Sequence, residues 1–245
     1  MSKFRNTVIA LLAFASVAMA GSFGFGTNRN IAAMSYKITN VNYYASSIYY
    51  GTNLAWSSQT FYSPASDFTY TTNNNEITIT GYVGAGGQVN IPPTIDGWPV
   101  RVLTAGSFSY NDDIINVVVP DSVAEIGSGV GDGTFRACHN LETVLLGNGV
   151  TNILAPSFYN TVKLGTVVFP ASLEHIGSYA FYVCTNLASV YFKGNAPTLG
   201  DLPFGANAAG CTVYRLSTAT GFGTVPDTFS GLPTAIWTSY PDPMP

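Results

Sequence analysis

Residues 164–187 read LGTVVFPASLEHIGSYAFYVCTNL, and this stretch decides the fold. Its apolar positions recur in the stretch before it, residues 141–164. The matching residues, in order, are Leu141, Val144, Leu146, Val150, Ile153 and Phe158 in the earlier stretch and Leu164, Val167, Phe169, Leu173, Ile176 and Phe181 in the later one. Phe135, Phe158 and Phe181 follow one another at intervals of 23 residues. The chain is therefore built from tandem repeats of about 23 residues.

The same pattern extends in both directions from this stretch. One unit covers residues 114–138, where the glycine-rich segment Gly127–Gly133 adds four residues. Another covers residues 187–204, and a weaker first copy covers residues 91–108. We place the repeat region at residues 76–210.

Each repeat predicts one short strand. Val144–Leu146 and Val167–Phe169 are rich in β-branched and aliphatic residues, and Gly147 or Pro170 ends each run. A unit of this size cannot bury its own apolar face, but stacked neighbours form one continuous core. We expect a solenoid with one short β-strand per coil and otherwise mostly irregular chain.

The pattern Leu-x-x-Val-x-Phe-Pro-x-x-Leu-x-x-Ile-Gly-x-x-Ala-Phe-x-x-Cys-x-x-Leu is complete from Leu164 to Leu187. It resembles the BspA-type (treponemal-type) leucine-rich repeat, and the resemblance covers residues 76–210. The chain departs from the pattern at Asn148, at Thr161 and in the glycine-rich insert. The resemblance implies a leucine-rich-repeat solenoid in an exported or surface-exposed protein that serves adhesion or binding.

The first twenty residues have the parts of a secretory signal peptide. A basic start is followed by an apolar run from Val8 to Ala18 and by Ala18-Met19-Ala20. The run is well short of the roughly 20 residues that a membrane-spanning helix needs, and no later stretch is long and apolar enough. We expect cleavage after Ala20 and a secreted or cell-surface protein with no membrane span.

The two ends of the mature chain differ from the repeats. Residues 21–75 are rich in Tyr and Asn, and no charged residue lies between Lys37 and Asp67. They could form an N-terminal cap, a small β domain or a stalk. Residues 211–245 resemble the closing segment of exported repeat proteins, which predicts a C-terminal cap.

Composition excludes one class of partner. Only 9% of the residues are charged, and the net charge is −4. Nucleic-acid binding needs clustered Lys and Arg to displace counterions, so we do not expect a nucleic-acid partner.

No residue pattern indicates catalysis, a metal or another cofactor. Cys138 and Cys184 occupy one repeat position two coils apart, which predicts small buried residues bonded to backbone, as at Thr161; a Cys184–Cys211 disulfide stays open. His139 and His175 are single, and His139 beside Cys138 lacks an evident orienting group. Asp121 and Glu125 are read as solvated surface carboxylates, and Gly84–Gly87 and Gly127–Gly133 as turns.

Strand alternation places a second set of side chains on the outer face of the predicted sheet. The expected outward residues are Val118, Leu145, Val168 and Tyr191, flanked by Asn116, Thr143, Thr166 and Ser189. Contiguous exposed apolar surface often marks an interaction site, although β-branched residues also simply suit strands. We expect this face to bind a protein or glycan outside the cell; the alternative is a structural display or spacer role without a specific ligand.

Overall fold

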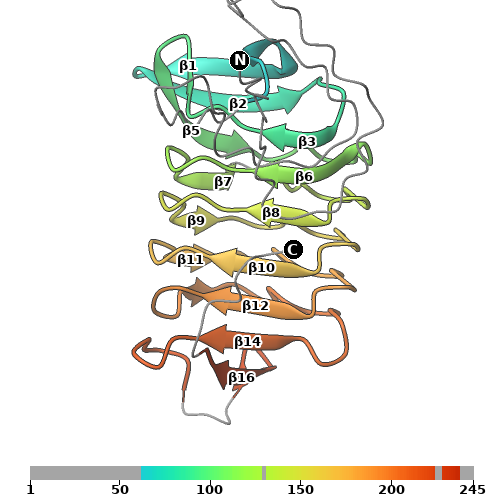
Figure 1. Ribbon diagram of the computed structural model, residues 1–245, viewed down its shortest axis with the longest axis vertical. Helices are drawn as coiled ribbons and strands as arrows, with labels where there is room; N and C mark the ends of the chain where they lie inside the picture. Colours follow the sequence, from blue (N-terminus) through green and yellow to red (C-terminus); the bar gives the residue numbers. More distant parts are fainter. Residues whose placement is uncertain (1–61, 129–130, 224–227, 238–245) are drawn as a thin grey trace, which may run out of the picture. The chain divides into compact units, whose positions relative to one another are not determined.

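The computed structural model describes residues 62–128, 131–223 and 228–237 (Figure 1). The predicted signal peptide, most of the segment 21–75 and part of the glycine-rich insert therefore lie outside the described residues. The elements are η1 (Ala65–Asp67), β1 (Phe68–Asn73), β2 (Glu76–Tyr82), β3 (Gly87–Asn90), β4 (Thr94–Ile95), β5 (Trp98–Thr104), β6 (Ile114–Val118), β7 (Glu125–Ser128), β8 (Thr143–Leu145), β9 (Asn152–Ile153), β10 (Thr166–Phe169), β11 (His175–Ile176), β12 (Ser189–Phe192), β13 (Thr198–Leu199), β14 (Thr212–Arg215), β15 (Thr228–Phe229) and β16 (Leu232–Ile236).

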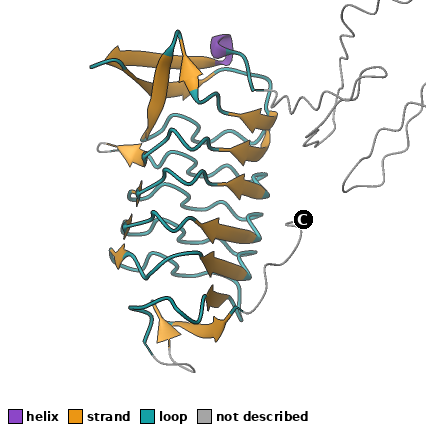
Figure 2. Ribbon diagram, turned by 60° about the vertical axis from the view of Figure 1, so that its left-hand side comes forward, coloured by secondary structure: helices purple, strands orange, loops and turns teal. Residues whose placement is uncertain are grey.

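The strands form two sheets on opposite sides of a stack of coils (Figures 1 and 2). The first sheet has the order β15-β16-β14-β12-β10-β8-β6-β3, and the second has the order β1-β2-β5-β7-β9-β11-β13, with β4 paired to β5. The predicted solenoid is confirmed, and the predicted strand of each coil lies in the first sheet. The second sheet adds a short strand that the sequence did not suggest, because two-residue strands such as β9 and β11 have no recognisable pattern.

The N-terminal end of the described chain is a β-hairpin. β1 pairs antiparallel with β2, and the turn residues Asn74 and Asn75 both have positive φ. Asparagine tolerates that left-handed conformation better than most residues do. The predicted boundary at residue 75 falls inside this turn, so the last part of the Tyr- and Asn-rich segment belongs to the solenoid's own sheet.

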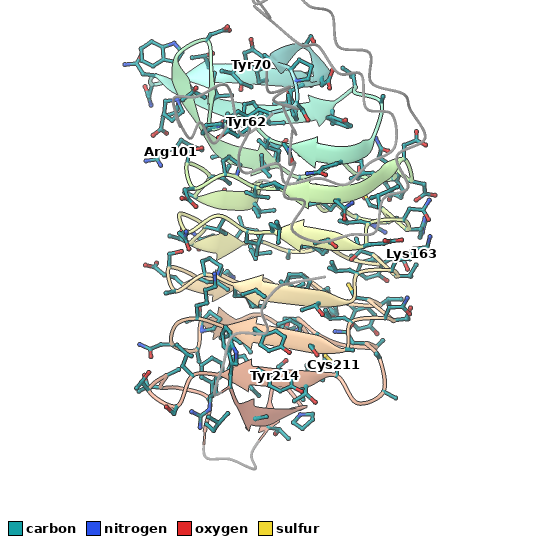
Figure 3. All side chains as sticks on the ribbon, in the orientation of Figure 1. Tyr62, Tyr70, Arg101, Lys163, Cys211 and Tyr214 are labelled. Atoms are coloured by element: carbon teal, nitrogen blue, oxygen red, sulfur yellow. The ribbon has the colours of Figure 1, made fainter. Side chains whose placement is uncertain are left out.

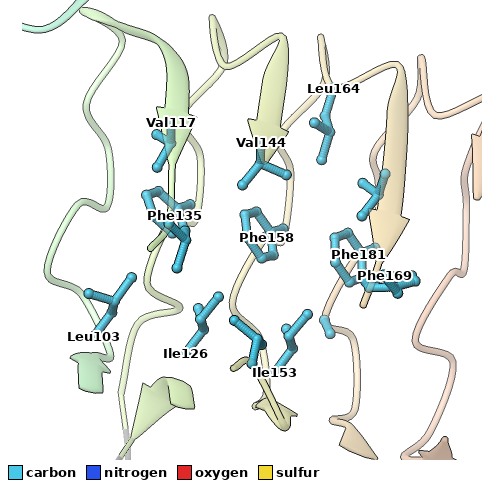
Figure 4. Close-up of a cluster of buried hydrophobic side chains, with 14 of the residues drawn as sticks. Leu103, Val117, Ile126, Phe135, Val144, Ile153, Phe158, Leu164, Phe169 and Phe181 are labelled. Atoms are coloured by element: carbon cyan, nitrogen blue, oxygen red, sulfur yellow. The ribbon is translucent and has the colours of Figure 1, made fainter. Parts of the chain in front are cut away.

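A ladder of phenylalanine rings runs through the core (Figure 4). Ring centroids are 4.8 Å apart from Phe108 to Phe135, 5.1 Å from Phe135 to Phe158 and 4.9 Å from Phe158 to Phe181. These separations match the spacing of roughly 4.7–4.9 Å between neighbouring strands, so each coil stacks one ring directly on the ring before it. The 23-residue interval in the sequence is the length of chain that returns to the same place one coil later.

Alternation along the strands of the first sheet sorts side chains into core and surface. Val117, Val144, Val167 and Val190 are each at most 2% exposed, as predicted for inward positions. Leu146, also expected inward, is only partly buried but packs against the same core.

The turn after each phenylalanine repeats an unusual backbone conformation. Ala137, Asn160 and Val183, two positions after their phenylalanines, have φ of 54°, 60° and 62°. A left-handed conformation is costly for a β-branched residue such as Val183, so the stacking of neighbouring coils must hold it there. In each case the backbone N–H donates to a carbonyl of the next coil, as from Val183 to Gly205 at 3.0 Å.

Coils approach so closely that some positions admit only glycine. A Cβ at Gly149 would lie 1.9 Å from the carbonyl oxygen of Asp121 in the coil before. Asp121 also accepts a hydrogen bond from the backbone N–H of Asn148 at 2.6 Å. Its carboxylate therefore fastens the next turn.

The cysteines form part of a buried hydrogen-bonding column. The thiol of Cys138 donates to the carbonyl of Phe108 at 3.0 Å, that of Cys184 to Phe158 at 3.2 Å, and the hydroxyl of Thr161 also donates to Phe158 at 2.8 Å. The predicted small residue bonded to backbone is confirmed. All three cysteines are free and buried, so Cys184 and Cys211 do not form a disulfide.

The segment from residue 211 onward first adds one more coil to the stack and then covers its open end. β14 pairs parallel with β12, with Thr212 opposite Ser189 and Tyr214 opposite Tyr191. β16 pairs parallel with β14 and folds back on β15. Phe222 and Phe229, 4.8 Å apart, contact Phe192 and cover the last coil.

Replacing Phe158 by Ala should destabilise the protein by about 3–5 kcal/mol, because the change opens a cavity between two stacked rings. Phe158→Leu keeps most of the volume and should cost less. Urea unfolding followed by circular dichroism measures both. Equal midpoints for Phe158→Ala and the unaltered protein would contradict the ladder as a source of stability.

Alkaline pH should lower the free energy of unfolding. Burial raises the pKa of the Cys184 thiol from 9.0 to about 12, and those of Cys138 and Cys211 to about 11. In the unfolded chain these thiols ionise near pH 9, whereas in the folded chain they stay protonated. The stability that they contribute is complete below pH 9 and is lost as pH rises toward 12.

Urea midpoints measured from about pH 8 to pH 11 test this dependence. Cys184→Thr, which installs the residue that the preceding coil carries, removes one titrating group and should make the decline shallower. An identical decline in the variant and the unaltered protein would show that Cys184 does not contribute to it.

Candidate binding face

Every residue that the sequence predicts for the outer face lies on β6, β8, β10 or β12, and the register aligns them. Asn116 is opposite Thr143, Thr166 is opposite both Thr143 and Ser189, and these residues form one column. Val118 is opposite Leu145, and Val168 is opposite Tyr191, which gives a second column beside the first. The two predicted columns are present.

One member is less accessible than expected. Val168 is only 8% exposed, whereas Leu145 and Tyr191 are half-buried. Val168 lies between the strands that carry these two larger side chains, and neighbours in one column shield a small residue between them.

Both columns extend further than the sequence analysis placed them. Gln88 of β3 is opposite Asn116, and Thr212 and Tyr214 of β14 are opposite Ser189 and Tyr191. We name Gln88, Asn116, Thr143, Thr166, Ser189 and Thr212 the polar column, and Val118, Leu145, Val168, Tyr191 and Tyr214 the apolar column. The signal for β14 was available, because Thr212-Val-Tyr repeats the Ser189-Val-Tyr pattern 23 residues later.

The apolar column changes character along the stack. Val118, Leu145 and Val168 are aliphatic, whereas Tyr191 and Tyr214 stack with centroids 4.6 Å apart and an interplanar angle of 13°. Trp237, immediately after β16, meets Tyr191 edge-on at 5.3 Å. Figure 3 labels Tyr214 on the first sheet, well away from Lys163 at the edge of the coils. The face therefore ends in an aromatic group that the sequence analysis did not include.

Much of the hydrogen-bonding capacity of the polar column is unused. Within the described part of the chain, the hydroxyls of Thr143, Thr166 and Ser189 make no hydrogen bond. The side-chain nitrogen of Asn116 is buried and has no partner. Buried polar groups are normally hydrogen-bonded, so an unsatisfied amide on an outer face is unusual. Neither column contains a charged side chain, so the face presents donors and acceptors without net charge.

His139 has an orienting group, contrary to the sequence analysis. Its Nδ1 lies 3.0 Å from Asp112 Oδ1, and its Nε2 lies 3.2 Å from the side-chain nitrogen of Asn160. The neighbouring Cys138 thiol instead donates to a backbone carbonyl, and burial raises its pKa to about 11. A nucleophilic cysteine needs the opposite shift. These contacts link three consecutive coils, because Asp112 belongs to the coil before His139 and Asn160 to the coil after it.

His175 also has a structural partner. Nδ1 of His175 lies 2.9 Å from the hydroxyl of Thr198, which itself donates to the carbonyl of Glu174. Among the residues that the structure describes, no three His, Cys, Asp or Glu side chains are grouped as a metal site. No helix in that part of the chain is long and apolar enough to cross a membrane.

A second aromatic row, which the sequence analysis missed, lies along the turns after the phenylalanines. The guanidinium of Arg136 lies 5.2 Å from the ring of Tyr159 and 5.9 Å from that of Tyr110. Tyr159 stacks on Tyr182 at 5.6 Å, and Arg136 is paired with Asp132 at 2.8 Å. The charge of Arg136 is thus already paired within the protein, by Asp132 and by two rings of the row, while Tyr110 is 58% exposed.

The comparisons with known proteins agree with the fold. A family model for the BspA type leucine rich repeat region matches residues 101–216 in six copies. The solved structure of a leucine-rich repeat protein from T. pallidum is 31% identical, with a TM-score of 0.58, over 63% of this chain and 71% of that chain. The comparison with curated proteins gives no match.

Two further solved structures show lower similarity. A leucine-rich repeat protein from Bacteroides capillosus is 26% identical, with a TM-score of 0.47, over 54% of this chain and 98% of that chain. A structure from Faecalibacterium prausnitzii, described as a leucine rich cell surface protein, is 20% identical, with a TM-score of 0.42, over 65% of this chain and 52% of that chain. The repeat pattern, the coil geometry and the match to the T. pallidum protein together show that this chain belongs to the BspA-type leucine-rich repeat family.

Proposed function

We propose that this protein is an exported binding or adhesion module that holds a protein or glycan on the outer face of its first sheet. The observation that carries the proposal is the uncharged pair of columns in register, the polar column from β3 to β14 and the apolar column from β6 to β14. A partner can contact several coils at once, because each strand adds one polar and one apolar position at a fixed spacing.

The physical state of the face supports this role. The hydroxyls of Thr143, Thr166 and Ser189 have no partner within the described residues, and the amide nitrogen of Asn116 is unsatisfied. A ligand that supplies hydrogen-bond partners would gain from the three hydroxyls while covering Leu145 and Tyr191, whereas the nitrogen of Asn116 is buried and is not accessible to it. Without charged groups on the face, affinity would come from contact area and hydrogen bonds, with little dependence on salt.

Export and the location outside the cell are part of the proposal. They rest on the charged start, the apolar run and the Ala18-Met19-Ala20 end of the first twenty residues. Among the described residues of this face, no combination of side chains suggests a reaction, so we propose binding without catalysis.

Replacing Leu145 by Asp should abolish partner binding and leave the fold intact, because Leu145 is half-buried on the outer face and not in the core. Its charge would be desolvated beneath any bound partner, at a cost of several kcal/mol. The measurement is binding of the mature chain to arrayed extracellular matrix proteins and glycans.

Asn152→Asp is the matched control, because it introduces the same carboxylate on β9 of the second sheet. Binding by the control together with loss in Leu145→Asp assigns the site to the first sheet. Equal binding by all three proteins would contradict the proposed face, and no binding to any arrayed partner by a folded protein would favour the display or spacer role.

A further inference from the structure

We propose that the C-terminal end of this face is a subsite for a neutral oligosaccharide, with Tyr214 as the stacking platform. The inference rests on the proposed function and specifies its ligand. It comes from three observations on the described residues: the last ring of the apolar column has a stacked ring on one side only, hydroxyls of the preceding strands of the polar column are unpartnered, and neither column contains a charged side chain.

Among the described residues, Tyr214 has a stacked aromatic neighbour on one side only. On one side Tyr214 stacks on Tyr191 at 4.6 Å. On the other side the opposing residue of β16 is Ala235. A methyl group covers much less of a phenol ring than another ring would, and no second ring contacts Tyr214 among the described residues. The stack therefore ends in a step, with the ring of Tyr214 as its wall and Ala235 as its floor.

Such a step suits the flat apolar face of a sugar ring. The C–H groups of a pyranose carry small positive charge, and the face of an aromatic ring is negative, so the two attract as they make contact. Trp237 stands edge-on to Tyr191 and is itself only 7% exposed, so it supports the ring of Tyr191 from the protein side.

The polar column supplies partners for sugar hydroxyls. Each sugar hydroxyl is both a donor and an acceptor, as are the unpartnered hydroxyls of Thr166 and Ser189. The phenol hydroxyls of Tyr191 and Tyr214 likewise make no hydrogen bond within the described residues. Elsewhere in this solenoid threonine hydroxyls are used internally, as when Thr134 and Thr151 donate to the carbonyls of Thr104 and Ala124. Within the described residues, the unpartnered hydroxyls of the polar column are those of Thr143, Thr166 and Ser189, whereas Thr212 at its end donates to the carbonyl of Gly210 at 3.1 Å.

Charge decides between classes of ligand. An acidic polysaccharide would need Lys or Arg on the face, and neither column contains one. A protein partner that used charged anchors would leave them unpaired on this surface at a desolvation cost. The face matches an uncharged ligand rich in hydroxyl groups, which is a neutral oligosaccharide.

The test uses the mature chain on an array with three arms: neutral homo-oligosaccharides of glucose, mannose, galactose and N-acetylglucosamine; uronic-acid or sulfated oligosaccharides; and extracellular matrix proteins. Tyr214→Ala removes the platform and should weaken binding to a neutral oligosaccharide about tenfold, the equivalent of roughly 1.4 kcal/mol. Tyr214→Phe keeps the ring and should lose much less. Tyr179→Ala, which removes a 41% exposed tyrosine from the turns, is the control and should bind as the unaltered protein does.

Ala235→Tyr gives a second, independent test. It fills the step and extends the aromatic stack, so it should block binding while leaving thermal stability equal or higher. Circular dichroism and a thermal melt of each variant separate loss of the site from loss of the fold.

The outcomes distinguish the subsite from the proposed function. Neutral-oligosaccharide binding that is lost in Tyr214→Ala and in Ala235→Tyr supports both. The protein could instead bind only a matrix protein or an acidic oligosaccharide, with binding abolished by Leu145→Asp and unchanged by Tyr214→Ala. That result overturns the subsite and supports the binding face. Neutral-oligosaccharide binding that neither Tyr214→Ala nor Ala235→Tyr changes also overturns the subsite, and no binding in any arm overturns both.

Discussion

The stacking of each coil on the one before it is the interaction on which the rest of the structure depends. Phenylalanine rings meet at 4.8–5.1 Å between neighbouring coils from Phe108 to Phe181, and the strands of the first sheet are in register at the same spacing. The left-handed turns and the buried thiols form hydrogen bonds between coils, and the glycines allow the backbones of neighbouring coils to approach closely. Because each coil touches mainly its neighbours, stability belongs to the stack and not to a single unit.

The same register that orders the core also orders the surface. Once Val167 and Val190 point inward, Thr166 and Ser189 must align outward, and the columns follow without any further constraint. The hydroxyl of Thr161, which faces the core, is bonded to a carbonyl, while those of Thr143, Thr166 and Ser189 on the outer face have no partner within the described residues. The repeat therefore sets which positions face outward, and the residues at those positions set the chemistry of the face.

The last coils are where this regularity is modified. The apolar column changes from aliphatic to aromatic at Tyr191, and the closing strand β16 places Ala235 rather than a third ring beside Tyr214. β15 and β16 cover the open end of the core with Phe229, while Trp237 contacts the outer face at Tyr191. The C-terminal end of the solenoid thus both closes the core and carries the aromatic residues of the outer face.

The sequence by itself determined the repeat, the solenoid, the inward and outward positions and the eight residues of the central face, because a period of 23 residues fixes which side chains become neighbours. It did not reveal the second sheet, the Asp112–His139 contact, the shielding of Val168 or the aromatic row at Arg136. Those depend on distances between side chains of different coils, which no periodicity specifies. The step at Tyr214 was decided by tertiary structure alone, since only the pairing of β16 with β14 sets Ala235 beside that ring.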